Sequence, residues 1–247
     1  MECKKSPCSL ELHDITFTYP GHQHPVFSQL DFQLSTKKIG LVGDNGSGKT
    51  TLLQIMVGLL KPDAGKILFN GRVMENEKDF FRLRRQVGML FQNAEDQLFC
   101  PSVLEDVAFG PLNLGQSQEE AREISISTLK RVGLSGYENR ITHRLSGGEK
   151  RLVALATVLA MEPSILLMDE PTNDLDHDGR HRLLEILTGL DQAFLLISHD
   201  WDFLAQLCNG FYGLEQGHLL KSDTLKVHQH RHAHPLGEQG HHHDHSK

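Results

Sequence analysis

A glycine-rich loop at residues 43–50, with the sequence GDNGSGKT, constrains this chain more than any other feature. It follows the apolar run Ile39 to Val42 and precedes an expected helix over Thr51 to Leu60, which is the setting of a phosphate-binding loop. There the glycines let backbone N–H groups turn toward phosphate oxygens, and the start of the helix adds positive potential. The bare pattern arises by chance in roughly one chain of this size per hundred, and its flanks lower that chance. The loop therefore predicts a nucleotide phosphate site between a strand and a helix.

Each residue of this loop is expected to contact the nucleotide. The predicted contacts come from Gly43, Asp44, Asn45, Gly46, Ser47, Gly48, Lys49, Thr50 and Thr51. Lys49 is expected to reach the β- and γ-phosphates, and the hydroxyl of Thr50 is expected to ligate Mg²⁺. The loop thus indicates ATP and Mg²⁺ as the ligands.

Composition narrows the class of protein. The 247 residues suffice for one large domain with a lobe, and 38% hydrophobic with 23% charged residues is ordinary for a globular chain. A net charge of −7 argues against nucleic acid or anionic lipid as a direct partner. No membrane-spanning stretch or signal peptide is visible, and the four cysteines are scattered. We therefore expect a cytoplasmic protein that meets a membrane only through protein partners.

Hydrophobic patterning predicts two kinds of strand. Alternation of apolar and polar residues over 15–19 and over 30–34 indicates half-buried antiparallel strands. Nearly continuous apolar runs indicate strands of a parallel sheet that is buried on both faces: Ile39 to Val42, Val87 to Phe91, Ile165 to Met168 and Phe194 to Ile197. Helices are expected over Glu119 to Val132 and Glu149 to Met161. The predicted fold class is α/β, a P-loop NTPase core with a mostly parallel sheet, an N-terminal antiparallel β subdomain and an inserted α-helical subdomain.

The domain organisation follows from the same patterns. Residues 1–9 form an N-terminal extension, and residues 10–222 form the predicted ATPase domain. Residues of about 93–145 lack buried strands and are expected to be the helical subdomain. Residues 223–247 have no apolar periodicity, so this histidine-rich tail is expected to be disordered without a ligand.

Two carboxylates follow one of the buried strands. Asp169 and Glu170 come at the carboxyl end of the run that starts at Ile165, where α/β sheets bind ligands. Asp169 is expected to hold Mg²⁺ and Glu170 to polarise an attacking water as a general base. A capped strand end before the turn at Pro171 is the simpler reading, which the neighbouring phosphate loop disfavours.

The segment LSGGE at residues 145–149 has two compatible interpretations. Ser146 and Glu149 form the pattern of a capping box that starts a helix. A helix start with two glycines is also open to an anion, because no side chain blocks its N–H groups.

Taken together, these motifs resemble the ATP-binding cassette (ABC) of transporters. The phosphate loop, Gln92, LSGGE, Asp169 with Glu170, residues 173–176 and His199 occur in that order, and the resemblance covers roughly Leu10 to Leu220. It implies that two cassettes, expected here as a homodimer, hold two ATP molecules head to tail between them. The signature residues Leu145, Ser146, Gly147, Gly148 and Glu149 would then contact the ATP of the partner cassette, so that hydrolysis needs the dimer.

The resemblance also assigns further roles. It implies that Gln92 senses Mg²⁺ and the membrane partner, that His199 stabilises the γ-phosphate, and that Tyr19 stacks on adenine. The dimer loop comprises Asn173, Asp174, Leu175 and Asp176. Taken alone, Gln92 could be a polar strand end, Tyr19 a core residue and His199 a helix start. One departure is the sequence Thr36-Lys37-Lys38 where the family has a Gly-Glu turn, which puts the local hairpin geometry in doubt.

Residues 91–99 (FQNAEDQLF) and 103–115 (VLEDVAFGPLNLG) resemble the cassettes of energy-coupling-factor transporters, with Ala94 in place of the usual proline. The resemblance implies a transmembrane coupling subunit and a substrate-binding membrane subunit as partners. It places the chain at the cytoplasmic face of the cell membrane.

The tail carries a set of imidazoles suited to nickel, cobalt, zinc or copper. They belong to His228, His230, His232, His234, His241, His242, His243 and His245. An expression tag is disfavoured because other residues interrupt the histidines, and incidental metal binding is nearly as good an explanation as a dedicated sensor.

These observations predict the ATPase subunit of a nickel or cobalt importer. The alternatives are an energy-coupling-factor ATPase for a vitamin, a soluble cassette ATPase without a transport role, and a metal-storage protein or metallochaperone that acts through its tail. Fused cassettes or long coiled coils would favour the soluble class, and the sequence has neither.

Overall fold

A central, mostly parallel sheet organises the computed structural model, which describes residues 8–222. Within that range the sheet has six strands in the order β10-β9-β3-β8-β7-β6, parallel except for the β9–β10 pair. The strands are β3 (Lys38–Val42), β6 (Val87–Leu90), β7 (Ile165–Asp169), β8 (Ala193–Ile197), β9 (Gly210–Glu215) and β10 (His218–Ser222). The four buried runs predicted from the sequence are β3, β6, β7 and β8, so the parallel core is confirmed.

An antiparallel sheet lies beside this core. Among the described residues it has the order β2-β1-β4-β5, with β1 (Leu10–Phe17), β2 (Phe27–Leu34), β4 (Ala64–Phe69) and β5 (Arg72–Val73). The first two strands match the predicted alternation, although β1 ends at Phe17, so Tyr19 lies beyond the strand. Only residues 35–37 connect β2 to β3, and the carbonyl of Lys37 accepts the N–H of Phe194 from β8 at 3.3 Å. The short Thr36-Lys37 turn thus joins the two sheets.

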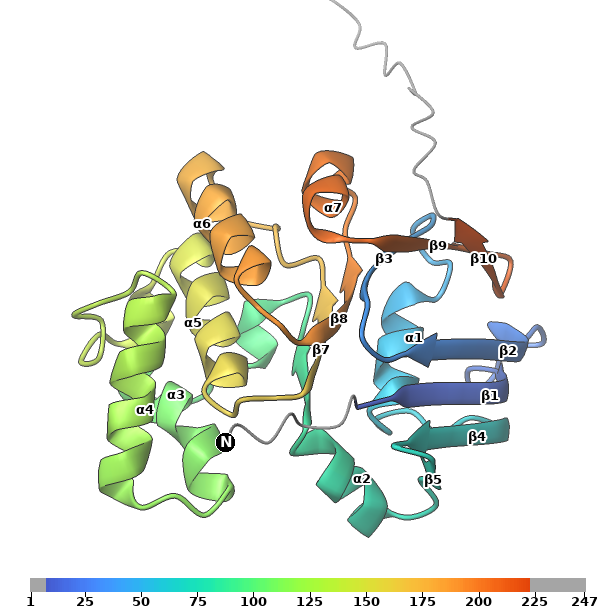
Figure 1. Cartoon of the computed structure of the whole chain (residues 1–247), viewed down its shortest axis with the longest axis horizontal. Coiled ribbons are helices and arrows are strands. Elements are labelled where there is room, and N and C mark those ends of the chain that lie inside the picture. The colour runs from blue at the N-terminus through green and yellow to red at the C-terminus, as the bar shows by residue number, and fades with distance from the viewer. Residues whose placement is uncertain (1–7, 223–247) are drawn as a thin grey trace, which may run out of the picture.

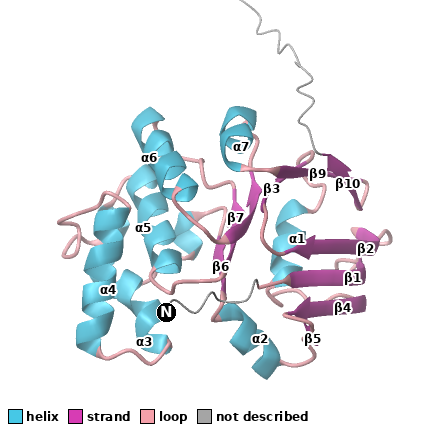
Figure 2. Cartoon of the chain, in the orientation of Figure 1, coloured by secondary structure: helices cyan, strands magenta, loops and turns pink. Residues whose placement is uncertain are grey.

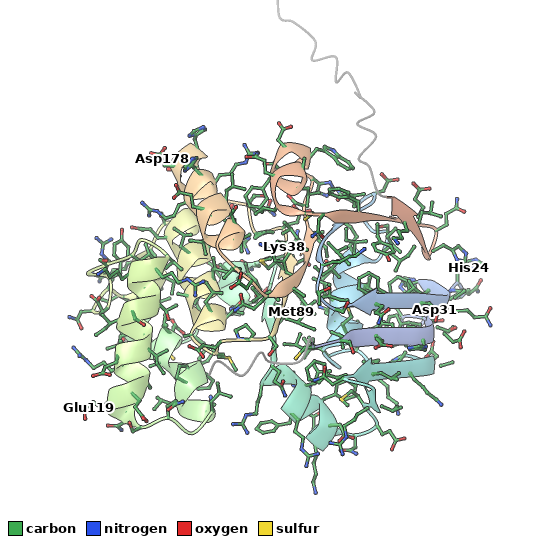
Figure 3. The ribbon with its side chains drawn as sticks, viewed as in Figure 1. His24, Asp31, Lys38, Met89, Glu119 and Asp178 are labelled. Carbon is green, nitrogen blue, oxygen red and sulfur yellow. The ribbon has the colours of Figure 1, made fainter. Side chains whose placement is uncertain are left out.

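The helices cover both faces of the core. They are α1 (Lys49–Met56), α2 (Glu77–Arg84), α3 (Val103–Asn113), α4 (Gln118–Arg131), α5 (Gly147–Leu159), α6 (His177–Thr188) and α7 (Trp201–Leu207), with short 3₁₀ turns η1 (Ala94–Asp96) and η2 (Thr142–Arg144). In Figure 1, α3 to α6 lie on one side of the central sheet, and α1 with the antiparallel sheet lies on the other. Glu119 of α4 and His24 mark the two opposite ends of the molecule (Figure 3).

Side chains of the parallel strands alternate between two hydrophobic cores. Leu166 and Met168 of β7 pack with the helical side, whereas Ile165 and Leu167 pack with α1 and the antiparallel sheet. A sheet that is buried on both faces requires apolar residues at every position, which explains the continuous runs in the sequence. Figure 2 shows the resulting division, with α3 to α6 on one side and the antiparallel strands with α1 on the other.

Capping residues set where several helices begin. Ser102, Ser117 and Ser146 each cap a helix and pair with a glutamate three residues later, so the predicted capping box of α5 is present. The predicted helix over Thr51 to Leu60 was too long, because α1 ends at Met56 and Gly58 adopts a left-handed φ of 71°. No helix among residues 8–222 is long and apolar enough to cross a bilayer. The predicted extension at 1–9 falls largely outside the described residues, and the predicted tail at 223–247 falls entirely outside them.

Candidate functional site

The phosphate loop connects the end of β3 to the start of α1. Gly48 is the N-cap residue of α1, with a left-handed φ of 103°. A Cβ atom at this position would approach Val26 Cγ1 at 2.7 Å and Phe27 Cζ at 3.0 Å. Backbone conformation and packing therefore both require glycine here, and the first N–H groups of α1 stay free of side-chain obstruction.

Lys49 lies over this loop. Its ammonium group donates to the carbonyls of Gly43 at 2.8 Å and Asp44 at 2.9 Å. Burial lowers the pKa of Lys49, whereas the nearby carboxylates of Glu170 and Asp169 favour its charged form. The cation is thus held among carboxylates and carbonyls at the position where the sequence predicts contact with phosphate.

A hydrogen bond between Thr50 and Asp169 connects the start of α1 to the end of β7. The Thr50 hydroxyl, in the first turn of α1, donates to Asp169 Oδ2 at 2.6 Å. In the sheet, β8 lies between β3, which precedes the phosphate loop, and β7, which ends at Asp169. Burial raises the pKa of Asp169, while this hydrogen bond and the charge of Lys49 act in the opposite direction. A hydroxyl beside a carboxylate is the oxygen donor set that Mg²⁺ prefers, so the two residues fit the predicted metal role.

Glu170 has an unusual backbone and an unsatisfied carboxylate oxygen. Its φ is 47°, in the left-handed region that is costly for a residue with a Cβ atom. Its Oε1 is buried without a hydrogen-bond partner among the described residues, whereas Oε2 accepts the N–H of His199 at 3.3 Å. Burial raises the pKa of Glu170, and the neighbouring His199 partly offsets this effect. A strained, desolvated carboxylate with one free oxygen is suited to bind and polarise a water molecule.

These groups line one cleft of about 990 Å³. The predicted residues on its walls are Tyr19, Asn45, Gly46, Gly48, Lys49, Thr50, Thr51, Gln92, Asp169, Glu170, Asn173 and His199. The Tyr19 hydroxyl is hydrogen-bonded to Thr51 Oγ1 at 2.8 Å, which leaves the ring at the edge of the cleft. The sequence analysis missed four wall residues, His22, Val26, Thr172 and Asp200. Thr172 and Asp200 are directly next to predicted site residues, and His22 lies three residues after Tyr19. This closeness in sequence is the signal that could have identified them.

The signature residues lie apart from these walls. Residues 145–149 are absent from the lining of the cleft and form the start of α5. Ser146 Oγ accepts the N–H of Glu149 at 3.2 Å, and the Glu149 carboxylate accepts the N–H of Ser146 at 2.8 Å. A Cβ atom at Gly147 would lie 3.1 Å from Asp174 Cβ, so the dimer loop packs against the signature. Leu175 and Asp176 continue that loop, and Asp176 caps α6.

Arg151 is a residue that motif reading did not identify. Its side chain is 1% exposed, and its guanidinium donates to the carbonyl of Phe91 at 2.7 Å and to that of Gln92. Gln97 adds a second link, because its amide donates to Ala154 O at 2.9 Å and to Thr157 Oγ1 at 2.8 Å. The segment that carries Gln92 is therefore attached to α5, the helix that the signature begins. The charged triplet Glu149-Lys150-Arg151 gives no sign in the sequence that this arginine is buried.

The predicted transition-metal ligands, His228 to His245, lie outside the described residues. Within residues 8–222 no cluster of three or more histidine, cysteine or acidic side chains is arranged to hold a metal ion.

Comparison with known proteins links this geometry to one family. Residues 27–173 match the family described as ABC transporter. A protein of Nitratidesulfovibrio vulgaris, provisionally named as an ABC transporter ATP-binding protein, is 52% identical over 95% of this chain and 86% of its own length. The energy-coupling factor transporter ATP-binding protein EcfA of Methanothermobacter thermautotrophicus is 40% identical over 87% of this chain and 70% of its own. The solved structure of cbiO1 from Clostridium perfringens, described as part of the ABC transporter complex cbiONQ, is 32% identical with a TM-score of 0.76 and covers 87% of this chain and 88% of its own.

Replacing Lys49 tests the phosphate site. We expect Lys49→Ala to weaken ATP binding at least tenfold, because the variant loses the charge-assisted contact to the phosphates, worth about 1.5–3 kcal/mol. Lys61→Ala is the control, since Lys61 is exposed and follows α1. Titration calorimetry with a non-hydrolysable ATP analogue measures both affinities. Equal affinity in Lys49→Ala and the unmodified chain would contradict the assignment of the loop.

Proposed function

Because the chain belongs to the ABC transporter family as one of its ATP-hydrolysing ATPase domains, we propose that it is the motor subunit of an energy-coupling-factor importer for nickel or cobalt. The observation that carries the motor role is the cleft in which Lys49, Thr50, Asp169 and Glu170 converge. The metal substrate is supported by the composition of the tail.

In the proposed reaction the residues of the cleft have different roles. Lys49 and the N–H groups at the start of α1 would bind the phosphates, and Thr50 with Asp169 would hold Mg²⁺. When bound, Mg²⁺ neutralises phosphate charge and orients the β- and γ-phosphates. The carboxylate of Glu170 accepts a proton from the attacking water, and His199 Nε2 lies 3.4 Å from its Oε1. Gln92 also lines the cleft, where it is suited to respond to the metal.

We propose further that the working unit is a dimer, expected to be a homodimer. The support is geometric, because Ser146 and Gly148 are separate from the cleft of their own chain. The start of α5, which is suited to bind an anion, is then available to an ATP molecule held by a second cassette. In a head-to-tail dimer, the cleft of each cassette faces the signature of the other, so each ATP contacts both.

A groove between the ATPase core and the helical side is the proposed contact for the transmembrane coupling subunit. It has a volume of about 260 Å³ and is lined by residues that include Leu59, Phe91, Phe99 and Phe109. Phe99 is 66% and Phe109 47% exposed, and their rings meet edge to face at 4.8 Å. Exposed aromatic residues beside a groove are typical of a site for a partner helix. Phe91 precedes Gln92, so the groove and the ATP cleft share one segment.

The membrane arrangement is part of the same proposal. The chain would sit at the cytoplasmic face of the cell membrane, bound to the coupling subunit, which in turn carries the substrate-binding membrane subunit. The name of the EcfA relative and the description of cbiO1 support this arrangement.

Glu170→Gln tests the general base. We expect kcat to fall by about 10²–10⁴-fold, since the amide cannot accept the proton, while ATP still binds and traps the dimer. Glu123→Gln, an exposed change on α4, is the matched control. Phosphate release measures turnover, and size-exclusion chromatography with ATP detects the dimer. Wild-type turnover in Glu170→Gln would remove this residue from the role of base.

Aromatic substitutions test the groove. We expect Phe99→Ala combined with Phe109→Ala to lose copurification with the membrane subunits, because their exposed apolar surface is gone. ATPase activity of the isolated chain should change little, since neither residue lines the cleft. Leu220→Ala removes a comparably exposed apolar residue, 54% exposed, from β10 and serves as the control. Unchanged copurification would place the membrane contact elsewhere.

Transport measured on the intact complex tests the substrate. We expect ATP-dependent uptake of radioactive nickel or cobalt by vesicles that contain this chain with its membrane subunits. Uptake of a vitamin, with no effect of either metal on transport or ATPase activity, would overturn the metal assignment. Failure to copurify any membrane subunit would favour a soluble ATPase.

A further inference from the structure

The signature helix carries a charge that opposes its proposed ligand. The start of an α-helix is equivalent to about half a positive charge, whereas an ionised glutamate in its first turn adds a full negative one. Glu149 is that residue in α5, and its pKa is lowered, first by its hydrogen bond from Tyr137 and then by that from the backbone of Ser146. Left unpaired, this carboxylate would repel an incoming phosphate.

Two side chains from the preceding loop surround this carboxylate. The Tyr137 hydroxyl donates to Glu149 Oε1 at 2.6 Å, and Arg140 Nη1 donates to the same oxygen at 3.1 Å. The Arg140 guanidinium also lies over the Tyr137 ring, 3.6 Å from its centroid. Three interactions thus hold one cation, one phenol and one carboxylate in a fixed arrangement.

Two cations that follow Glu149 in α5 are engaged elsewhere. Lys150 forms an ion pair with Glu95, and Arg151 points inward to the carbonyls of Phe91 and Gln92. Asp174, which packs on Gly147, favours the charged form of Arg151. Arg140 is the cation that forms an ion pair with Glu149.

The loop that presents Arg140 is anchored by backbone bonds. The carbonyl of Arg140 accepts the N–H of Val103 at 3.0 Å, and that of Glu138 accepts the N–H of Leu104 at 3.0 Å. Both donors belong to the first turn of α3, so a change of the Arg140 side chain leaves these bonds in place.

We infer that Arg140 and Tyr137 are positioning residues that hold Glu149 and cancel its charge, so that the start of α5 attracts the γ-phosphate of an ATP bound by a second copy of this chain. The inference rests on the proposed head-to-tail dimer. It deepens that proposal, because it explains the affinity of the signature helix for phosphate by the cancelled charge of Glu149.

Dimerisation of the Glu170→Gln chain with ATP provides the test. Each half-exposed Arg140–Glu149 ion pair is expected to change the dimer dissociation constant about threefold. A symmetric dimer contains two such pairs, so we expect Arg140→Met to raise this constant about tenfold. Arg140→Lys should keep most of the affinity, because it keeps the charge. Arg122→Met, an exposed change on α4 with the same loss of charge, should have no effect. Sedimentation velocity measures all four chains.

A rescue separates charge from structure. Adding Glu149→Gln to Arg140→Met should restore dimerisation to within about twofold of Glu149→Gln alone, since no charge is then left to cancel. ATP affinity of the monomer, measured below the dimer dissociation constant, should be the same with and without Arg140→Met. An unaltered Arg140→Met dimer, or a weakened one that Glu149→Gln does not restore, would overturn the inference. If the Glu170→Gln chain itself forms no dimer with ATP, the proposed function fails together with the inference.

Discussion

Parallel pairing of neighbouring strands is the constraint on which the rest of this structure depends. β3, β8, β7 and β6 lie side by side and run in the same direction, so their carboxyl ends meet at one edge. The phosphate loop follows β3, His199 follows β8, Asp169 and Glu170 end β7, and Gln92 follows β6. The hydrogen bond from Thr50 to Asp169 closes this arrangement across β8. Chemistry that is spread over more than 150 positions of sequence therefore occupies one cleft.

Burial shifts the pKa values of the acidic groups in this cleft. The strands are apolar on both faces, so polar groups at their ends are partly desolvated and their pKa values move. Burial favours the neutral forms of both Asp169 and Glu170, while Lys49 and His199 favour the charged forms. The left-handed backbone of Glu170 directs its carboxylate to a different position from that of Asp169. Two adjacent carboxylates thus acquire different surroundings, which suits one to a metal and the other to water.

A second set of contacts connects this cleft with the helical side. Arg151, Gln97 and Lys150 attach residues 91–97 to α5, and the backbone of 138–140 attaches α3 to the loop before α5. The groove at Phe99 and Phe109 borders the same segment. A partner that moves the helical side would move Gln92 and the signature together, because these contacts attach residues 91–97 to α5. This connection is the physical basis on which the proposed coupling to a membrane subunit rests.

The sequence by itself determined the elements whose signal is local. Continuous apolar runs predicted the four central strands, and capping residues predicted the start of α5, because both depend on neighbouring residues along the chain. The sequence did not indicate β4, β5, β9 or β10. Their hydrophobic patterns are short or mixed, and these segments become strands by pairing with other strands. Nor did the sequence reveal Arg151 or the pairing of Arg140 with Glu149. Hydrogen bonds between segments 9 to 60 positions apart depend on how helices pack, and only the tertiary structure decides that.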